Sequence, residues 1–354
     1  MDQPAITSKL LRWYNRNSRD LPWRHTRDPY AIWVSEIMLQ QTQVDTVIPY
    51  YRRFLARFPS VNDLAEARPD EVLKLWENLG YYSRARNLHA AAKAIVAHCQ
   101  GALPQNRKDL LALPGIGEYT ASAILSIAFT KPFAAIDGNV SRVISRLFAL
   151  RRPLGSPESR EQIRDQVNHL LNKKRPGQFN QAMMDLGATV CTPRTPSCLS
   201  CPVMGSCKAK ALGLQEQLPV PPKRHALSHK HMIAAILLDR KKRVLVLRRP
   251  ASGLLGGLWR FPGGEIGARE SGKNAVARTV REELGLTIRV KEEVALIKHA
   301  YTHFRATFHV YRCSLVPGTP TSYGGLKWKW VSAEELRRLA LSKAERKILA
   351  VLQS

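Results

Sequence analysis

The hydrophobic pattern of this 354-residue chain changes once along its length, and this change limits the folds that it can adopt. Over residues 5–211 the apolar positions recur with the period of a helix, and no run alternates like a strand. Residues 212–229 contain clustered prolines without a sustained apolar period, which predicts a linker. Short apolar runs typical of strands follow it. The sequence therefore predicts two domains, an all-α domain over residues 1–211 and an α+β domain over residues 230–354.

The second domain is expected to contain several strands and two helices. The runs MIAAILLD and RVLVLRR flank a short polar turn, as in a β-hairpin, and strand-like runs follow at Thr287–Val290 and Thr307–Leu315. A helical pattern covers Lys273–Leu284. Ser332 and Glu335 have the spacing of a capping box, which predicts a C-terminal helix.

The charge balance indicates a polyanionic partner. Lys and Arg number 55 against 28 Asp and Glu, a formal net charge of +27, and no lysine-rich tail accounts for the excess. Nucleic acid suits such a chain best, and a basic enzyme without such a partner is the plainer alternative. No apolar run approaches the roughly 18 residues of a membrane span, and no signal peptide is evident. We expect a soluble, bacterial-type cytoplasmic protein that associates with the nucleoid.

One ionisable residue lies on a helix that is otherwise apolar. Asp28 followed by Pro29 predicts a helix N-terminus, and Glu36 then falls on the same stripe as Ile32 and Leu39. Burial there would raise the pKa of the Glu36 carboxyl, so that it could act as a general acid near neutral pH. A buried carboxylate paired with an arginine, important for folding only, is the alternative interpretation.

Two further stretches suit contacts with DNA. The polar, uncharged run Gln40–Gln43, which includes Gln41 and Thr42, offers donors and acceptors that suit base edges. Residues 113–117, LPGIG, separate two helical patterns, and the glycines Gly115 and Gly117 allow a tight turn whose amides can hold a phosphate. An ordinary corner between two helices is the alternative, but in so basic a chain the motif indicates a helix-hairpin-helix module.

Asp137 lies in the segment IDGNV, which also contains Asn139 and precedes the helical pattern SRVISRLF. Asp137 could simply cap that helix. The helix N-terminus would also keep its carboxylate ionised, lowering its pKa, while burial raises the pKa of Glu36. Two carboxyl groups separated in this way can cleave a glycosidic bond through a cationic sugar.

Four of the six cysteines lie close together, with the spacing C-x6-C-x2-C-x5-C: Cys191, Cys198, Cys201 and Cys207. Zinc in a four-cysteine site usually takes two close pairs, whereas here a single close pair is flanked by two longer arms. One 4Fe-4S cluster fits this spacing better, and it fits a reducing compartment better than disulfides do. Such a cluster would most simply hold a loop that carries Arg194 and Lys208 against DNA.

These features together resemble the endonuclease III superfamily of helix-hairpin-helix DNA glycosylases. Within that superfamily, WVSEIMLQQTQV, the doublet Tyr81–Tyr82 and FNQAMMDLGA at Phe179–Ala188 resemble the MutY family of adenine glycosylases. Bifunctional members of the superfamily carry a nucleophilic lysine two residues after the last hairpin glycine, where this chain has Tyr119. The resemblance therefore implies a monofunctional glycosylase, because no Schiff base can form by that route without the amine.

The resemblance also implies a mechanism. Adenine is flipped out of the duplex, and Glu36 protonates its N7 to make a leaving group. Asp137 stabilises or transiently traps the sugar cation, Tyr119 supports it, and water completes the hydrolysis. The implied partner is duplex DNA with an adenine:8-oxoguanine or adenine:guanine mispair, bound by a monomer. Further residues are implied, three lining the base pocket and three filling or wedging the disrupted stack: Trp23, Arg24 and Gln181, and Leu39, Gln41 and Tyr81.

The second domain resembles a Nudix hydrolase. Loss of one glutamate of the Nudix box, replaced here by Thr279, weakens a magnesium site for a diphosphate, so we expect recognition without hydrolysis. In the MutY family such a domain senses 8-oxoguanine, and the resemblance assigns this role to Tyr301, Thr302 and His303. The remaining positions of the box are present: Gly264, Glu270, Arg278, Val280, Glu282, Glu283, Gly285 and Leu286.

Three other functions are conceivable. An endonuclease III-like lyase for oxidised pyrimidines would share the first domain, but it would need the lysine that Tyr119 replaces. A nucleotide-pool hydrolase would place its chemistry in the second domain, where Thr279 interrupts the Nudix box. A DNA-binding protein without chemistry would have no need of both Glu36 and Asp137.

Overall fold

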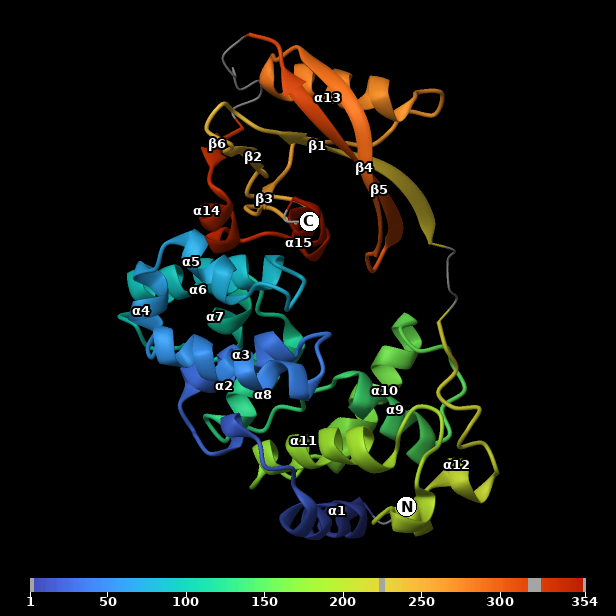
Figure 1. The fold of residues 1–354 in the computed structure, drawn as a ribbon. Coiled ribbons are helices and arrows are strands. Elements are labelled where there is room, and N and C mark those ends of the chain that lie inside the picture. The colour runs from blue at the N-terminus through green and yellow to red at the C-terminus, as the bar shows by residue number, and fades with distance from the viewer. Residues whose placement is uncertain (1–2, 223–226, 318–325, 353–354) are drawn as a thin grey trace. The chain divides into compact units, whose positions relative to one another are not determined.

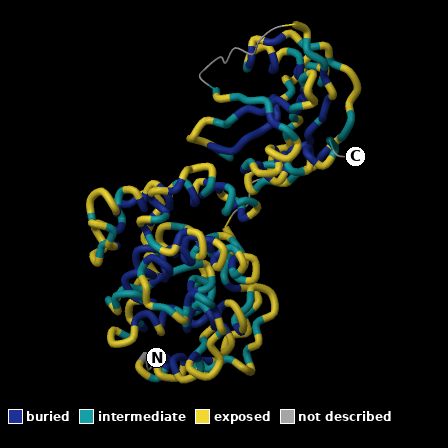
Figure 2. The backbone as a smooth tube through the Cα atoms, turned by 60° about the vertical axis from the view of Figure 1, so that its left-hand side comes forward, coloured by how far each residue is buried: buried dark blue, intermediate teal, exposed yellow. Residues whose placement is uncertain are grey.

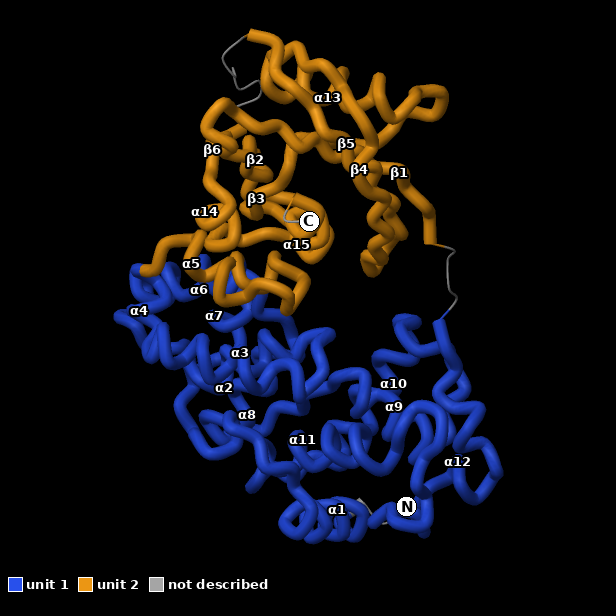
Figure 3. Tube along the Cα trace, viewed as in Figure 1, with its two compact units in different colours: residues 1–66, 87–224 blue, residues 67–86, 225–354 orange. Residues whose placement is uncertain are grey.

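The computed structural model of the chain divides into two compact units. Residues 1–66 and 87–224 form the first unit, and residues 67–86 and 225–354 form the second (Figure 3). The segment 67–86 therefore groups with the C-terminal residues, although the sequence analysis placed it in the first domain. The structure describes residues 3–222, 227–317 and 326–352.

All regular secondary structure among the described residues of the first unit is helical, as the sequence predicts (Figure 1). Helix α6, Ser83–Cys99, begins in the segment that groups with the second unit and ends in the first. The other α-helices of the first unit are α1 Gln3–Asn17, α2 Pro29–Leu39, α3 Val44–Arg57, α4 Val61–Glu66, α7 Arg107–Ala112, α8 Glu118–Ile127, α9 Gly138–Leu147, α10 Pro157–Leu170, α11 Pro176–Asp185 and α12 Lys208–Ala211. Its short 3-10 or π turns are η1 Pro22–Arg24, η2 Leu186–Val190, η3 Cys198–Ser200 and η4 Met204–Ser206.

Helices α1, α9, α10 and α11 share one apolar core. Leu10, Ile144, Val167 and Phe179, one from each helix, are at most 1% exposed within it. Burial of side chains of this size contributes about 1.5–3 kcal/mol each, which holds these four helices together. Helix α2 packs against α3 and α8, and α7 packs against α8, so that a second group of helices forms in the same unit. Figure 2 shows the buried stretches of the backbone in dark blue.

In the part of the second unit that the structure describes, two three-stranded sheets combine with helices. The strands lie in the orders β1-β5-β4 and β3-β2-β6, with β1 parallel to β5 and β4 antiparallel to it. The strands are β1 Ser228–Leu237, β2 Val244–Arg248, β3 Trp259–Arg260, β4 Ile288–Ala300, β5 Phe304–Leu315 and β6 Trp328–Val331. The helices are α5 Pro69–Leu75, α13 Gly272–Leu284, α14 Ala333–Arg338 and α15 Lys343–Val351.

The sheet β1-β5-β4 is covered by a helix on each face. Alternate residues of a strand point to opposite faces, so Ile233 and Ala235 of β1 meet the apolar side of α13, whereas Ala234 and Ile236 pack with α15. The predicted helix at Lys273–Leu284 is thereby confirmed as α13. The capping box of Ser332 is confirmed at the start of α14.

The predicted β-hairpin is wrong. Strands β1 and β2 belong to different sheets, and the chain around the turn between them forms an isolated bridge between Leu238 and Val244. The polar turn between them does close, since the N–H of Asp239 donates to the carbonyl of Arg243 at 3.0 Å. Beyond the turn β1 pairs along its whole length with β5, a strand far away in the sequence. An apolar run specifies that a strand is buried but not which neighbour it pairs with.

The predicted linker is partly packed against the first unit. Leu218 is buried, and its carbonyl accepts a hydrogen bond from Nε of Arg146 at 2.8 Å. The N–H of Leu154 donates to the carbonyl of Val220 at 2.9 Å. Residues 223–226 of the predicted linker lie outside the described residues. No helix among the described residues has the length and apolar character needed to cross a membrane.

Candidate active site

A cavity of about 1390 Å³ opens between the two groups of helices in the first unit. It exceeds the roughly 300–1,000 Å³ of small-molecule pockets, so it has room for a nucleotide and its neighbours. Parts of α2, α8, α11 and the N-terminus of α9 form its walls. It brings together these residues that the sequence analysis singled out: Trp23, Arg24, Glu36, Leu39, Gln41, Thr42, Tyr119, Asp137, Asn139 and Gln181.

Helix α2 carries Glu36 into the cavity. Asp28 caps the helix as predicted, with its carboxylate oxygens accepting the backbone N–H groups of Tyr30 at 3.1 Å and Ala31 at 3.2 Å. The helix is buried on almost every side rather than along one stripe. Glu36 itself is 5% exposed. Burial raises the pKa of Glu36 to about 7, so its carboxyl is partly protonated near neutral pH.

Glu36 is hydrogen-bonded to a phenol. The hydroxyl of Tyr119, in the first turn of α8, donates to Oε2 of Glu36 at 2.6 Å. This hydrogen bond opposes the rise in the pKa of Glu36, whereas the nearby charge of Asp137 raises that pKa further. The guanidinium of Arg24 binds a different carboxylate, that of Asp185. The alternative interpretation of Glu36 as a carboxylate held in an ion pair with arginine is therefore disfavoured.

Asp137 is the N-cap of α9 and lines the same cavity. Its Oδ1 accepts the backbone N–H of Val140 at 2.7 Å, and its Oδ2 accepts Nδ2 of Asn139 at 3.0 Å. We predicted a lowered pKa for Asp137, and this direction is wrong, because burial raises it. Its hydrogen bonds and the charge of Arg142 only oppose the rise. Burial of the whole carboxylate thus outweighs the helix N-terminus.

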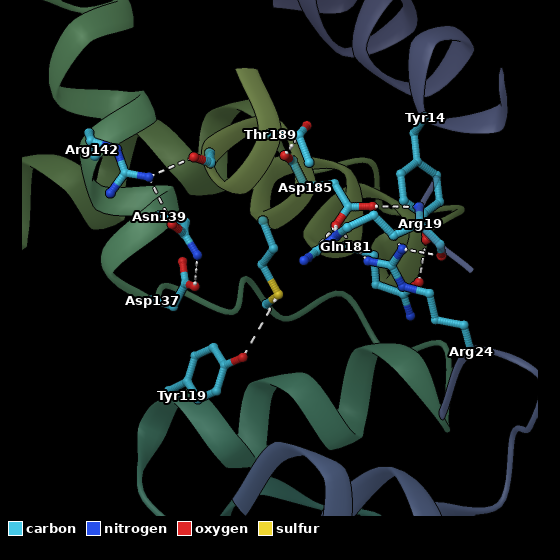
Figure 4. Close-up of polar contacts among 12 residues, drawn as sticks. Tyr14, Arg19, Arg24, Tyr119, Asp137, Asn139, Arg142, Gln181, Asp185 and Thr189 are labelled. Atoms are coloured by element: carbon cyan, nitrogen blue, oxygen red, sulfur yellow. Dashed lines mark hydrogen bonds and ion pairs between the residues drawn. The ribbon is translucent and has the colours of Figure 1, made fainter. Parts of the chain in front are cut away.

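Arg142, which the sequence analysis missed, connects Asn139 to Gly187 and to the start of the cysteine loop, the segment 191–207 that carries the four spaced cysteines (Figure 4). Its Nη2 donates to Oδ1 of Asn139 at 2.8 Å and to the carbonyl of Gly187 at 2.7 Å, and its Nε donates to the carbonyl of Cys191 at 2.8 Å. Asn139 in turn donates to Asp137. Arg142 follows Asn139 by three residues on α9, the spacing of neighbours on one helix face, and this was the available signal.

A second polar network holds the opposite wall of the cavity (Figure 4). Asp185 is completely buried at the end of α11, and Arg24 binds both of its carboxylate oxygens, at 2.7 and 2.8 Å. Arg19 donates to the same carboxylate through Nε at 2.7 Å. Burial raises the pKa of Asp185, but its hydrogen bonds and ion pairs with Arg24 and Arg19 outweigh this effect, and the net pKa is lowered. Asp185 therefore orients Arg24 as a permanent anion.

Gln181 is oriented by a residue from the first helix. The hydroxyl of Tyr14 donates to Oε1 of Gln181 at 2.5 Å. The carbonyl end of the amide is thereby occupied, and its NH₂ group is left for the cavity that Gln181 lines. Neither Asp185 nor Tyr14 was identified from the sequence, because their partners lie more than 150 residues away along the chain.

The turn between α7 and α8 has the form expected of a helix-hairpin-helix module. Gly115 has a φ of 77°, and a Cβ on it would lie 2.6 Å from the Cβ of Asn87. Only glycine meets both demands. Gly117 caps α8, so the free amides of the first turn of α8 are directed to the same side as the turn.

The four cysteines lie together after α11. Cys191, Cys201 and Cys207 pack against the core of α1, α9, α10 and α11, and Nη1 of Arg146 donates to Sγ of Cys191 at 3.3 Å. Burial raises the pKa of Cys201 to about 11, and the charges of the other three thiolates add to this effect. The thiols are therefore within electrostatic reach of one another. Among the described residues, no three or more His, Cys, Asp or Glu side chains converge as they would on a single metal ion.

Known proteins resemble the chain over both of its parts. Residues 34–172 match the family described as HhH-GPD superfamily base excision DNA repair protein, and residues 233–351 match the NUDIX domain. The adenine DNA glycosylase of Rattus norvegicus is 35% identical over 407 residues, which cover 99% of this chain and 78% of the rat protein. The chain belongs to the adenine DNA glycosylases. The family members of Homo sapiens and Arabidopsis thaliana are 35% and 36% identical and cover 99% and 97% of this chain, and 74% and 63% of their own lengths.

Solved structures confirm the fold of the glycosylase domain. A thermostable thymine-DNA glycosylase superposes with a TM-score of 0.54 at 31% identity, covering 59% of this chain and 97% of its own. A trapped complex of endonuclease III with DNA superposes with a TM-score of 0.52 at 21% identity, covering 60% of this chain and 99% of its own. The predicted fold class, a helical HhH-GPD domain followed by an α+β NUDIX domain, is thereby confirmed.

The carboxylates of the Nudix box in this glycosylase are paired with arginines. Arg260 donates to both carboxylate oxygens of Glu283, which is largely buried. Arg278 binds Glu270 through Nε and Nη2, each at 2.8 Å, and Glu282 through Nη1 at 2.9 Å. Each of these groups already has a cationic partner, and a divalent ion would have to displace it.

Thr279 occupies a buried position beside the Nudix loop. It is 5% exposed, and its Oγ1 has no hydrogen-bond partner among the described atoms. A Cβ added to Gly264 would lie 3.3 Å from Cγ2 of Thr279, so the loop packs directly on this side chain. The position that a metal-binding glutamate would take is thus filled by a small side chain in van der Waals contact.

Tyr81, one of the residues predicted to wedge the duplex, contacts the predicted 8-oxoguanine-sensing triplet within the second unit of the glycosylase. The hydroxyls of Tyr81 and Thr302 share a hydrogen bond of 2.7 Å. Tyr81 is 38% exposed and has a φ of 46°, which is uncommon for a bulky residue. Tyr301 stacks on Phe304, with 4.6 Å between the ring centroids, and His303 is exposed. Tyr81 and the predicted sensing triplet therefore lie at one surface.

Proposed function

We propose that this chain is a monofunctional DNA glycosylase that hydrolyses the N-glycosidic bond of adenine mispaired with 8-oxoguanine or guanine in duplex DNA. Membership of the adenine DNA glycosylases supports the reaction and the base. The observation that carries the mechanism is that Glu36, with its pKa raised to about 7, and Asp137 lie in one cavity. Glycosidic cleavage requires one carboxyl group as an acid and a second that stabilises the sugar cation, and these two groups can supply both roles.

Glu36 is the general acid. A flipped adenine that enters the cavity brings its N7 to the carboxyl of Glu36. In the fraction of molecules in which this carboxyl is protonated, it donates its proton as the base departs. Protonation makes the purine a neutral leaving group instead of an anion. The hydroxyl of Tyr119, hydrogen-bonded to Glu36, fixes the direction in which the carboxyl points.

Asp137 stabilises the sugar cation that remains. Its hydrogen bonds from Val140 and Asn139 favour the ionised carboxylate, and they hold it at a fixed position at the start of α9. Water then adds to the cation and completes the hydrolysis. Tyr119 stands where a lyase needs an amine, so the product is an abasic site in an intact strand.

The other lining residues recognise the base and the duplex. Trp23 packs edge-on against Tyr51 beside the cavity, and Arg24 and Gln181 are held by Asp185 and Tyr14 so that they present donors to the purine. The hairpin amides after Gly115 and Gly117 hold backbone phosphates without reading sequence. Leu39 and Gln41, which line the cavity, and Tyr81 of the second unit fill or wedge the disrupted stack, and Thr42 offers a hydroxyl to a base edge.

Recognition of the opposite base belongs to the second unit. Thr302 offers a hydroxyl and His303 an exposed imidazole, both of which can hydrogen-bond a purine edge. Thr279 and the arginine-paired glutamates support recognition without hydrolysis. The partner is thus duplex DNA that contains the mispair, which the net charge of +27 favours, and the protein is expected to bind it as a monomer.

The four cysteines fit one 4Fe-4S cluster held by Cys191, Cys198, Cys201 and Cys207. Their spacing, one close pair between two longer arms, suits a cluster better than the two close pairs usual for a four-cysteine zinc site, and the thiols influence one another electrostatically. Such a cluster supplies a structural cross-link for the loop. Arg146 hydrogen-bonds to the sulfur of Cys191 and to the carbonyls of the two residues that follow it.

A single variant tests the role of Glu36. Glu36→Gln keeps the size of the side chain but cannot donate a proton as an acid, so it is expected to bind a duplex with an adenine:8-oxoguanine pair while releasing adenine about 10²–10⁴-fold more slowly. Single-turnover release and duplex binding are measured on the same preparation. Full activity in this variant would remove Glu36 from the mechanism.

Duplexes that differ only in the central pair separate the competing functions. Strand breaks at the adenine site are measured before and after treatment with alkali. Breaks that appear only after alkali, and only when adenine stands opposite 8-oxoguanine or guanine, are the expected result. Breaks without alkali would instead show a lyase.

A further inference from the structure

Three histidines lie in a row on one face of the sheet β1-β5-β4. His229 and His231 of β1 point to the same side as Ile233, which α13 covers, since alternate residues share a face. In the parallel register His231 is paired with Thr307 and Ile233 with His309, so His231 and His309 are diagonal neighbours on adjacent strands. His229 and His231 are exposed, and 21% of the His309 side chain is exposed.

The imidazoles of His231 and His309 have the spacing of two zinc ligands. Nδ1 of His231 lies 3.3 Å from Nε2 of His309. Two zinc–nitrogen bonds of about 2.0–2.1 Å at the tetrahedral angle place their nitrogens about 3.3 Å apart. The same distance also suits a hydrogen bond between two neutral imidazoles, so geometry at this pair alone does not choose between them.

The carboxylate of Glu293 favours the metal site. Its Oε1 lies 3.0 Å from Nδ1 of His309, and its Oε2 accepts the hydroxyl of Tyr311 at 3.3 Å. Nδ1 of His309 must therefore carry a proton, and in the neutral ring the lone pair then lies on Nε2, directed toward His231. Metal-binding histidines almost always donate their second ring N–H to a carboxylate or carbonyl in this way.

His229 supports the ring of His231. The two rings stack with their centroids 5.1 Å apart and an angle of 22° between their planes. Nε2 of His229 is held by Oγ1 of the buried Thr307 at 2.9 Å. The ring of His231 therefore has a defined position although it is exposed.

We propose that Nδ1 of His231 and Nε2 of His309 bind a divalent transition-metal ion, with zinc as the probe, and that water completes the coordination. Imidazole ligands select zinc, copper or nickel over magnesium. A bound ion would join β1, the strand that follows the linker, to β5, which begins one residue after His303. The sheet edge beside the predicted sensing triplet would then be cross-linked by metal as well as by backbone hydrogen bonds.

Calorimetric titration of the full chain with zinc chloride tests the site, after removal of loosely bound metal with a chelator and at mildly alkaline pH. With half the ligands of a structural zinc site, binding of one ion with a dissociation constant on the order of 10 µM is expected. His231→Ala and His309→Ala each abolish this binding, and His169→Ala, which removes an exposed histidine of α10, leaves it unchanged. Magnesium chloride gives no saturable heat.

A variant that retains both ligands guards against loss of folding. Glu293→Gln keeps the two histidines but weakens the orientation of His309, and zinc binding is expected to fall about 10- to 100-fold. Cobalt(II) distinguishes the ligands, because thiolates add a near-ultraviolet charge-transfer band that imidazoles lack. Zinc binding undiminished in both histidine variants, no saturable binding in the wild type, or a thiolate band from the bound cobalt would each overturn the proposal.

Discussion

The hydroxyl of Tyr119 donates a 2.6 Å hydrogen bond to Oε2 of Glu36, and this contact joins α8 of the hairpin module to the buried acid of α2. Burial raises the pKa of Glu36 to about 7, and the phenol opposes that rise because it stabilises the ionised carboxylate. Burial also raises the pKa of Tyr119 itself, so the phenol stays protonated and remains a donor. The pH at which Glu36 loses its proton is therefore set partly by Tyr119.

Tyr119→Phe should shift the pH dependence of adenine release. Glu36 must be protonated to act, so the rate falls as pH rises through its pKa. Without the phenol the pKa of Glu36 rises further. The alkaline limb of the pH–rate profile, where the rate falls, should therefore move up by about one pH unit, the size expected for one hydrogen bond to a charged group. Single-turnover rates across pH measure the limb. Tyr82→Phe, which removes a hydroxyl in the second unit, is the control, and a limb that stays in place would show that the phenol does not tune Glu36.

Tyr14→Phe should weaken recognition of adenine by releasing Gln181. The hydroxyl of Tyr14 occupies Oε1 of Gln181, and burial keeps that phenol protonated by raising its pKa. Without it the amide can rotate and present its oxygen to the base, at a cost of about tenfold in the single-turnover rate. Gln181→Ala should cost a similar factor, and the double variant little more. Additive losses in this double-mutant cycle would show that the two residues act independently.

The local signals in the sequence indicated Glu36 and Asp137, which the structure places in one cavity, but not the network around them. Asp28 before Pro29 fixed the start of α2, and the apolar neighbours of Glu36 indicated its burial, because both signals lie within one helix. The pKa of Asp137 was wrong in direction because its desolvation depends on helices packed around it. The pairing of Tyr14 with Gln181 joins α1 to α11, and no periodicity encodes such a contact.

In the second unit too, local patterns predicted single elements but not the contacts between distant ones. The strand character of β1 and β2 was evident from their apolar runs, and the capping box at Ser332 was correct, since each depends on a few adjacent residues. The hairpin failed because the partner of β1 is β5, and strand pairing is decided by the packing of the whole sheet. Thr279 was recognised as a departure from the Nudix box, but the pairing of Glu283 with Arg260 required the fold.

Asp185→Asn should destabilise the first unit and alter its response to acid. Removing one partner of a buried pair leaves the guanidinium of Arg24 uncompensated, at a cost of about 3–5 kcal/mol. The folded-state pKa of Asp185 lies below its unfolded value, so its contribution is present above the unfolded value of about 3.9 and is lost as pH falls below it. Urea denaturation at neutral pH and at a pH below about 3.9 measures both effects. Asp165→Asn, an exposed change on α10, is the control, and equal stability of the two variants at neutral pH would contradict the assignment.

The purified chain should not hydrolyse nucleoside triphosphates with magnesium. Glu283 is paired with Arg260, Glu270 and Glu282 are paired with Arg278, and a small side chain fills the position of the missing glutamate. Pyrophosphate release from 8-oxo-dGTP and dGTP with magnesium measures the activity, with a known Nudix hydrolase as the positive control. Turnover that disappears in Glu282→Gln would show that the box still binds metal.

Arg142→Lys should impair the positioning of Asp137 and the retention of iron together. The planar guanidinium of Arg142 reaches three acceptors at once, on Asn139, Gly187 and Cys191, and the point charge of a lysine cannot reproduce this arrangement. A Cβ on Gly187 would lie 2.6 Å from the Cβ of Asn139, so the turn that leads to Cys191 already packs tightly on the start of α9. Loss of one or two charged hydrogen bonds predicts an adenine release rate about 10- to 100-fold lower, with less iron per chain. Arg151→Lys, an exposed change after α9, should alter neither quantity. A variant with full iron content and full activity would show that Arg142 does not hold Asn139 and the cysteine loop in place.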